Sequence, residues 1–172
     1  SEGEIKLVEG WEKVKKSLDY LIKILPIEAY IDSAEDLISP RTIVPMVAFL
    51  SKNNFHFTPQ QKNYFLRCFF LATLWSRYSY SPVSRLDLDV RTVSSEKNPT
   101  SKLIESLRGP RSILTVTAKD LDRARINTGF GKMVLIVAKH QKAQDWFVGT
   151  PLSGRGTGKY SIEQHHIFPR SI

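Results

Sequence analysis

In the first half of the chain, a serine or threonine is followed directly by a proline at several positions, and these dipeptides divide the chain into helical segments. Thr58-Pro59-Gln60-Gln61 combines a threonine cap, a proline at the first helical position and a glutamine three residues after the cap. Ser39-Pro40 is a second start of this kind, and Ser81-Pro82 breaks the pattern ahead of a further helical stretch. These signals predict a succession of helices over this part of the chain.

The spacing of apolar residues supports a mainly α, helical bundle-like fold. Residues recur at intervals of three and four before Pro26, which is expected to end that helix: Leu7, Trp11, Val14, Leu18, Leu21, Ile22 and Leu25. Strands are expected only near the end of the chain, around Trp146–Val148 and Ser161–Phe168. Further helices are expected over 40–50, 59–78, 83–93, 100–107, 118–125 and 132–141, the last entered through Gly129-Phe130-Gly131.

Composition limits the class of protein and its partners. The chain has 172 residues and a formal net charge of +8, which favours a polyanionic partner, nucleic acid first. Its single cysteine, Cys68, excludes an intrachain disulfide and reads as a small buried thiol. With no signal peptide and no apolar run long enough to span a bilayer, the expected location is the cytoplasm.

Two carboxylates and one arginine are candidates for a polar site in the helical region. Asp87 and Asp89 lie two residues apart on an expected helix, where side chains do not face each other. A solvated face or ion pairs with Arg85 or Arg91 are therefore preferred to a metal site. For Arg77, a buried pairing with an acidic residue explains its presence as well as a catalytic role does.

The most informative residues are the last ten, Glu163 to Ile172, which contain the adjacent histidines His165 and His166. Neighbouring side chains on a strand point to opposite faces, so the two imidazoles are suited to different tasks. One neutral imidazole on a metal and one general base is the natural division. The preceding loop, Gly154 to Lys159, is either a plain linker or a phosphate clamp.

Three segments resemble GmrSD-like proteins, the bacterial type IV restriction and phage-defence proteins that end in an HNH (His-Me finger) nuclease domain. The similarity is clearest at Asp145-Trp-Phe-Val-Gly-Thr-Pro-Leu152 and His165-His-Ile-Phe-Pro169. Leu74–Ser79 followed by Arg85–Asp89 resembles their helical region. The resemblance implies a helical domain over 1–144 and the start of an incomplete ββα-metal motif over 145–172.

The same resemblance implies roles for individual residues. His165 would be the metal ligand and His166 the general base, with a divalent ion such as Mg²⁺ or Mn²⁺ polarising the scissile phosphate. Arg155, Lys159 and Arg170 are the corresponding candidates for phosphate contacts. The asparagine and the last histidine or asparagine of such a site do not follow His166, so this chain alone is expected to be inactive or nearly so.

Three functions remain open at this level. The first is a fragment of a metal-dependent DNA endonuclease from a bacterial restriction or phage-defence system. The second is a helical module that binds nucleic acid or senses a target without catalysis. The third is an interaction domain that positions the nuclease against a nucleotide-binding domain, which in such proteins precedes this region. Basic residues gathered on one face would favour nucleic acid, whereas an exposed apolar patch would favour a protein partner.

Overall fold

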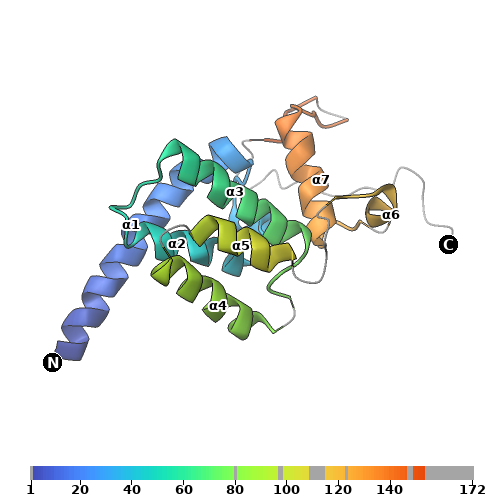
Figure 1. Ribbon diagram of the computed structural model, residues 1–172. Coiled ribbons are helices and arrows are strands. Elements are labelled where there is room, and N and C mark those ends of the chain that lie inside the picture. Colours follow the sequence, from blue (N-terminus) through green and yellow to red (C-terminus); the bar gives the residue numbers. More distant parts are fainter. Residues whose placement is uncertain are drawn as a thin grey trace, which may run out of the picture.

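The computed structural model describes residues 2–79, 81–96, 99–108, 115–122, 124–146 and 149–153, and within these ranges the fold is mainly helical (Figure 1). Two short 3₁₀ turns, Ala34–Asp36 and Pro40–Ile43, precede the second α-helix. The α-helices are α1 (Glu2–Ala29), α2 (Val44–Leu50), α3 (Pro59–Leu74), α4 (Pro82–Ser95), α5 (Pro99–Arg108), α6 (Ala118–Leu121) and α7 (Gly129–His140). The prediction of a helical, bundle-like fold is confirmed.

The helix starts follow the sequence signals closely. The Thr58 hydroxyl accepts a hydrogen bond from the Gln61 N–H at 3.3 Å, and the Gln61 side chain accepts one from the Thr58 N–H at 2.9 Å. This reciprocal pair satisfies two backbone donors that the first turn of α3 would otherwise leave open. Pro45 lies in the first turn of α2, where its missing N–H costs no hydrogen bond.

The first helix differs from the prediction because it continues through Pro26 to Ala29. The last turn of α1 places Leu25 and Ala29 in the core, and both are buried. Burial of this turn offsets the hydrogen bond that a proline removes from a helix interior. The helix ends where Tyr30 adopts a left-handed backbone, with φ 56°.

Three other predicted boundaries are wrong. Helix α3 ends at Leu74 instead of continuing to Tyr78, because Ser76 has a left-handed φ of 47° and turns the chain. Helix α6 ends at Leu121, four residues short of the prediction. Trp146, expected in a strand, lies in a turn, and the strand expected over 161–168 lies outside the described residues.

The core lies between the second half of α1, α2, α3 and α5. Helix α3 packs against α5 and α7, α2 packs against α1 and α4, and α4 packs against α5. Three phenylalanine rings meet at the centre, where the centroids of Phe49 and Phe65 are 4.7 Å apart and those of Phe57 and Phe65 are 5.0 Å apart. Such ring pairs stabilise a core beyond the area that they bury.

Helix α7 lies so close to the end of α3 that glycine is required at its start. A Cβ atom at Gly129 would lie 2.1 Å from the carbonyl oxygen of Thr73, and one at Gly131 would lie 1.8 Å from that of Arg125. The Thr128 hydroxyl caps this helix by accepting from the Gly131 N–H at 3.1 Å. Gly129-Phe130-Gly131 is thus a helix entry, as its sequence predicts, and one that α3 can contact closely.

Gly129→Ala is expected to lower the free energy of unfolding by about 2 kcal/mol or more, because the added methyl group collides with backbone that has no room to yield. Thermal and urea unfolding measure the loss. Gly10→Ala is the matched control, since a Cβ at Gly10 has nothing within 4 Å. Equal melting temperatures for the two variants would contradict this close packing.

Candidate functional site

The five residues that the sequence nominates for chemistry all lie outside the described residues. These are Arg155, Lys159, His165, His166 and Arg170, in the segment after residue 153. The described residues show instead the part of the chain that precedes this segment. Three features carry this information: a turn after α7, a buried lysine in α7, and a buried arginine network beside α3.

A hydrogen-bonded turn connects α7 to the segment that carries the histidines. The Leu152 N–H donates to the Ala143 carbonyl at 3.0 Å, and the Asp145 N–H donates to that of Thr150 at 2.8 Å. The Gly149 N–H donates to the Asp145 carbonyl at 2.9 Å, with Gly149 at a left-handed φ of 66°. These bonds reverse the chain directly after α7, in the upper right of Figure 1.

The turn presents a tryptophan to solvent. Trp146 is 83 % exposed, more than any other large apolar residue among the described residues. Helix α7 ends at His140, six residues before it, and Lys142 follows that helix with a left-handed φ of 57°. The indole of Trp146 is therefore accessible to a partner.

A buried lysine anchors α7 to the connection after α1. The Lys139 ammonium lies 2.9 Å from a carboxylate oxygen of Asp32 and 2.8 Å from one of Asp36, and its side chain is almost fully buried. Asp36 also accepts the Asp32 N–H at 2.9 Å, which fixes the carboxylate in place. Two acidic partners repay the cost of taking the ammonium out of water. The sequence prediction missed this site, because its partners lie about 100 residues apart.

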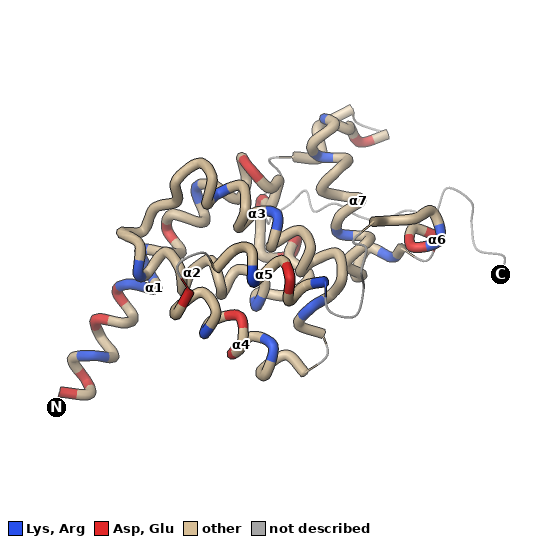
Figure 2. The backbone as a smooth tube through the Cα atoms, viewed as in Figure 1, with Lys and Arg blue, Asp and Glu red and all other residues tan. Residues whose placement is uncertain are grey.

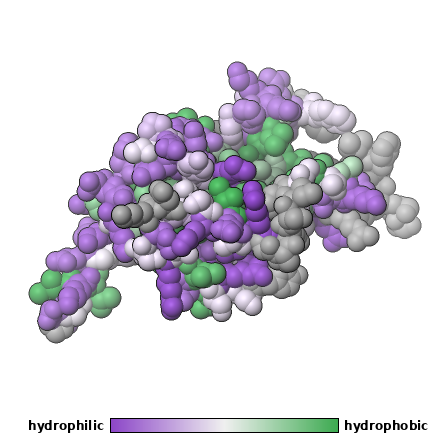
Figure 3. Space-filling view, in the orientation of Figure 1, coloured by the Kyte–Doolittle hydropathy of each residue, from purple (hydrophilic) through white to green (hydrophobic). Residues whose placement is uncertain are grey.

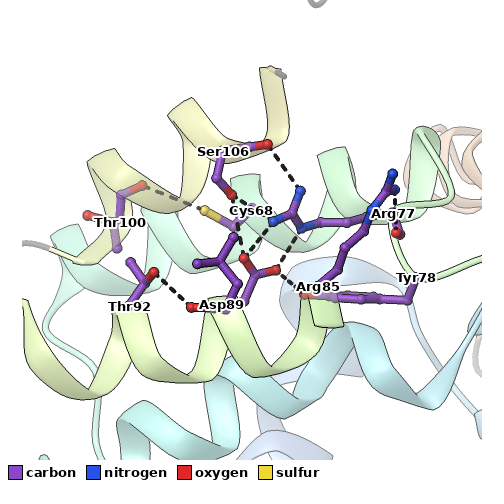
Figure 4. A network of polar contacts seen from close by, with 9 residues as sticks. Cys68, Arg77, Tyr78, Arg85, Asp89, Thr92, Thr100 and Ser106 are labelled. Atoms are coloured by element: carbon purple, nitrogen blue, oxygen red, sulfur yellow. Dashed lines mark hydrogen bonds and ion pairs between the residues drawn. The ribbon is translucent and has the colours of Figure 1, made fainter. Parts of the chain in front are cut away.

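The second buried charge is Arg77, which forms a two-pronged ion pair with Asp89 (Figure 4). Its Nε and Nη2 atoms donate to the two carboxylate oxygens of Asp89, each at 2.6 Å. The guanidinium also donates to Ser106, to the hydroxyl at 2.7 Å and to the carbonyl at 3.1 Å. The residues come from the end of α3, from α4 and from α5, so the pair ties these three helices together.

Tyr78 and Arg85 complete this network (Figure 4). The Tyr78 hydroxyl donates to Asp89 at 2.7 Å, and the Arg85 guanidinium donates to the Arg77 carbonyl at 2.9 Å. Asp89 therefore pairs with Arg77 and not with a neighbour on its own helix. The interpretation of Arg77 as a buried arginine with an acidic partner is confirmed, whereas a solvated Asp89 is wrong. Asp87 does form the expected exposed pair with Arg91, at 2.8 Å.

Tyr78 and Arg77 each keep one protonation state at neutral pH. Burial raises the pKa of the Tyr78 hydroxyl, and the negative charge of Asp89 raises it further, so Tyr78 stays a neutral donor. Burial lowers the pKa of Arg77, but the hydrogen bonds and charge of Asp89 outweigh this effect, and the net pKa is raised. The Tyr78 hydroxyl and the Arg77 guanidinium are thus suited to a structural role, since neither exchanges a proton near pH 7.

Cys68 lies beside this network and is chemically quiet. Burial, with a contribution from the charge of Asp89, raises the pKa of its thiol to about 12. A thiol with this pKa is protonated at neutral pH and serves neither as a nucleophile nor as a metal ligand. The prediction of a small buried thiol is confirmed.

Removing one partner of the Arg77–Asp89 pair leaves the other charge buried. Arg77→Met is expected to lower the free energy of unfolding by about 3–5 kcal/mol, because Arg77 is only 9 % and Asp89 only 2 % exposed. Arg77→Met combined with Asp89→Leu is expected to cost less than the sum of the single changes, as urea unfolding of all four proteins measures.

Asp87→Asn is the matched control on the same helix. The Asp87 side chain is 53 % exposed, so its pair with Arg91 is screened by water and its loss is expected to cost less than about 0.5 kcal/mol. A similar cost for Asp87→Asn and Arg77→Met, or strict additivity of the two buried changes, would contradict the structural role of the pair.

Basic charge is concentrated toward the end of the chain. Residues 108–172 carry 11 lysines and arginines against four aspartates and glutamates, whereas residues 1–107 carry 14 against 13. Figure 2 shows basic and acidic residues alternating along α1 and α4. Of the basic residues on α7, Lys139 is neutralised by two aspartates, and Lys132 donates to the Glu35 carbonyl. The excess of positive charge therefore lies in the C-terminal part of the sequence and not in residues 1–107.

A metal site is not formed by the described residues alone. Among them no group of three or more histidine, cysteine, aspartate or glutamate side chains is placed to hold an ion. The donor that suits a divalent transition metal is the neutral imidazole of the histidine pair, which lies after residue 153.

Comparisons of the chain with protein-family models, with curated proteins and with solved structures find no match. Among the described residues, no helix is both long enough and apolar enough to cross a membrane. The resemblance to GmrSD-like proteins therefore stands on the sequence motifs and remains a prediction.

Proposed function

We propose that this chain belongs to a metal-dependent DNA endonuclease of the HNH class, from a bacterial restriction or phage-defence system. The observation that carries the proposal is the sequence His165-His166-Ile167-Phe168-Pro169, preceded by the basic, glycine-rich loop over 154–159. Its setting supports the proposal, because the chain enters this segment from a hydrogen-bonded turn fixed to α7. A catalytic segment needs such a rigid base.

Each residue has a distinct task in this proposal. His165 holds the divalent ion, and His166 takes a proton from the attacking water. Arg155, Lys159 and Arg170 contact phosphate oxygens. The ion, when bound, supplies the positive charge that stabilises the phosphate and its leaving oxygen. The buried pairing of Lys139 with Asp32 and Asp36 acts at a distance, by holding α7 in place.

Plasmid cleavage with magnesium, manganese or nickel tests the proposal, on this chain and on the full product of its gene. We expect the full product to cut and this chain to cut weakly, because one imidazole ligand leaves a divalent ion mostly hydrated. His166→Ala is expected to reduce the rate about 10²- to 10⁴-fold, the usual contribution of a general base, and a chelator should abolish cutting.

His56→Ala is the matched control for that assay. His56 is exposed, lies before α3 and contacts the Tyr20 ring edge-on at 5.5 Å between centroids, so its loss should not alter the rate. Cleavage by the full product that survives His166→Ala would reject the assignment of the base. Metal-dependent cleavage by this chain alone would show that it holds its own ligand set.

A nucleic-acid-binding module without catalysis is the second candidate, and the exposed Trp146 favours it. An aromatic ring on a basic surface can stack on an unpaired base, which contributes about 1–3 kcal/mol per base. The charge of residues 108–172 supplies the attraction to phosphates. Binding and cleavage are separable, so a loss of one need not remove the other.

Trp146→Ala is therefore expected to weaken binding to a single-stranded oligonucleotide about tenfold, measured by fluorescence anisotropy at several salt concentrations. Tyr64→Ala is the matched control, because Tyr64 is an exposed aromatic residue of α3, 39 % exposed. Equal affinities for these two variants would exclude stacking on Trp146. A steep salt dependence in the absence of cleavage by the full gene product would favour the binding module.

A further inference from the structure

The first half of α1 extends away from the rest of the molecule. Residues 2–13 are all exposed, and the buried residues of this helix begin only at Ser17. Figure 1 shows this half of the helix projecting beyond α2 and α4, with the N-terminus at its tip. None of its side chains contributes to the hydrophobic core.

This projecting half carries the same apolar stripe that buries the second half. Leu7, Trp11, Val14, Leu18, Leu21 and Leu25 follow one another at alternating intervals of four and three, which is a heptad pattern. Leu21 and Leu25 are buried in the core, whereas Leu7 is 75 % and Trp11 59 % exposed. The projecting tip shows this apolar surface in Figure 3. The apolar stripe of α1 therefore continues beyond the core, and in the projecting half no other part of the described chain covers it.

A helix in this position needs a partner for its stability. An isolated helix of about 12–15 residues is marginal in water even when its sequence is favourable. This segment contains Gly3 and Gly10, each of which weakens a helix by about 1 kcal/mol relative to alanine. A surface that covers the stripe would stabilise this half of the helix.

The charged residues of the segment indicate what kind of surface would cover the apolar stripe. Residues 2–10 carry three glutamates and one lysine, and residues 11–16 carry three lysines and one glutamate. The segment is therefore acidic at its start and basic at its end, so that an antiparallel copy of the same segment places opposite charges together. A parallel copy would place like charges together.

We propose that the projecting half of α1 pairs antiparallel with the same segment of a second copy of this chain. The stripes meet with Leu7 of each copy opposite Trp11 of the other, and Glu4 of each copy comes near Lys15 of the other. Lys15 now pairs with Glu12 three residues away, an exposed contact at 2.5 Å that costs little to exchange. The pairing is independent of the proposed nuclease and binding functions.

The size of the contact sets its strength. Fifteen residues of helix span about 22 Å, so the interface falls at the small end of specific protein interfaces. We expect a dimer that dissociates in the micromolar range, with the molar mass rising toward twice the monomer value as concentration increases. Sedimentation equilibrium on the intact chain measures this directly.

Leu7→Asp tests the stripe, and Ile5→Asp is its matched control. Both residues are exposed aliphatic side chains on the same helix turn, with Ile5 61 % exposed, but Ile5 lies on the side away from the stripe. Leu7→Asp is expected to raise the dissociation constant at least tenfold, and Ile5→Asp to change it less than threefold. Neither change should alter the melting temperature of the dilute monomer, since both side chains are outside the core.

Charge reversal tests the orientation. Glu4→Lys alone and Lys15→Glu alone each place like charges together in the antiparallel pair and are expected to weaken it severalfold. The double variant restores opposite charges and should recover the original dissociation constant to within about twofold.

A chain that stays monomeric at all concentrations up to the millimolar range overturns the proposal. Equal effects of Leu7→Asp and Ile5→Asp, or a double charge variant weaker than both single ones, also overturn it. A loss of nuclease activity or DNA binding with the dimer intact leaves this pairing standing, so the outcomes of the two proposals are distinguishable.

Discussion

The ion pair between Arg77 and Asp89 determines how α3, α4 and α5 can be arranged. Both charges are removed from water, so each must lie where the other can satisfy it. Two parallel hydrogen bonds from the planar guanidinium fix the orientation of the carboxylate. Ser106 and Tyr78 occupy most of the remaining hydrogen-bonding positions of the pair. A rotation of any of the three helices would break several of these bonds together. The left-handed turn at Ser76 follows from the same requirement, because it brings Arg77 and Tyr78 toward Asp89.

Lys139 is likewise a buried charge, and Asp32 and Asp36 satisfy it on the other side of α3. It fixes α7 to the connection that follows α1, while Gly129 lets the start of α7 touch the end of α3. Helix α7 is therefore held at both ends, by close packing at one and by a buried charge at the other. The turn that follows α7 therefore starts from a fixed position. A functional segment after this turn needs such a fixed starting point.

The sequence predicts those parts of the fold that depend on neighbours in the chain. The reciprocal cap at Thr58 and Gln61 and the helix entry at Gly129 rest on local rules, and both are present. Pro26 was expected to end α1, but the burial of Ala29 depends on helices elsewhere in the chain. The partners of Asp89 and Lys139 could not be assigned, because no local pattern shows which distant charge shares a buried site. Of the candidate site, the histidine pair is a sequence prediction outside the described residues, and the exposure of Trp146 became apparent only in the structure.

The N-terminal and C-terminal parts of the chain differ in charge and in apolar surface, and this difference favours a different partner for each. The projecting half of α1 has nearly balanced charge and an apolar stripe, so desolvation of that stripe favours a protein surface over a polyanion. The C-terminal part has a large excess of positive charge and an exposed indole, the features that the proposed phosphate and base contacts require. An antiparallel pair of α1 helices would join two chains, each with its own basic C-terminal part. Two such parts can contact one long polyanion at once, and the second contact then gains from the high effective concentration that the first creates. A weak dimer at one end of the chain would in this way strengthen nucleic-acid binding at the other without any change in either surface.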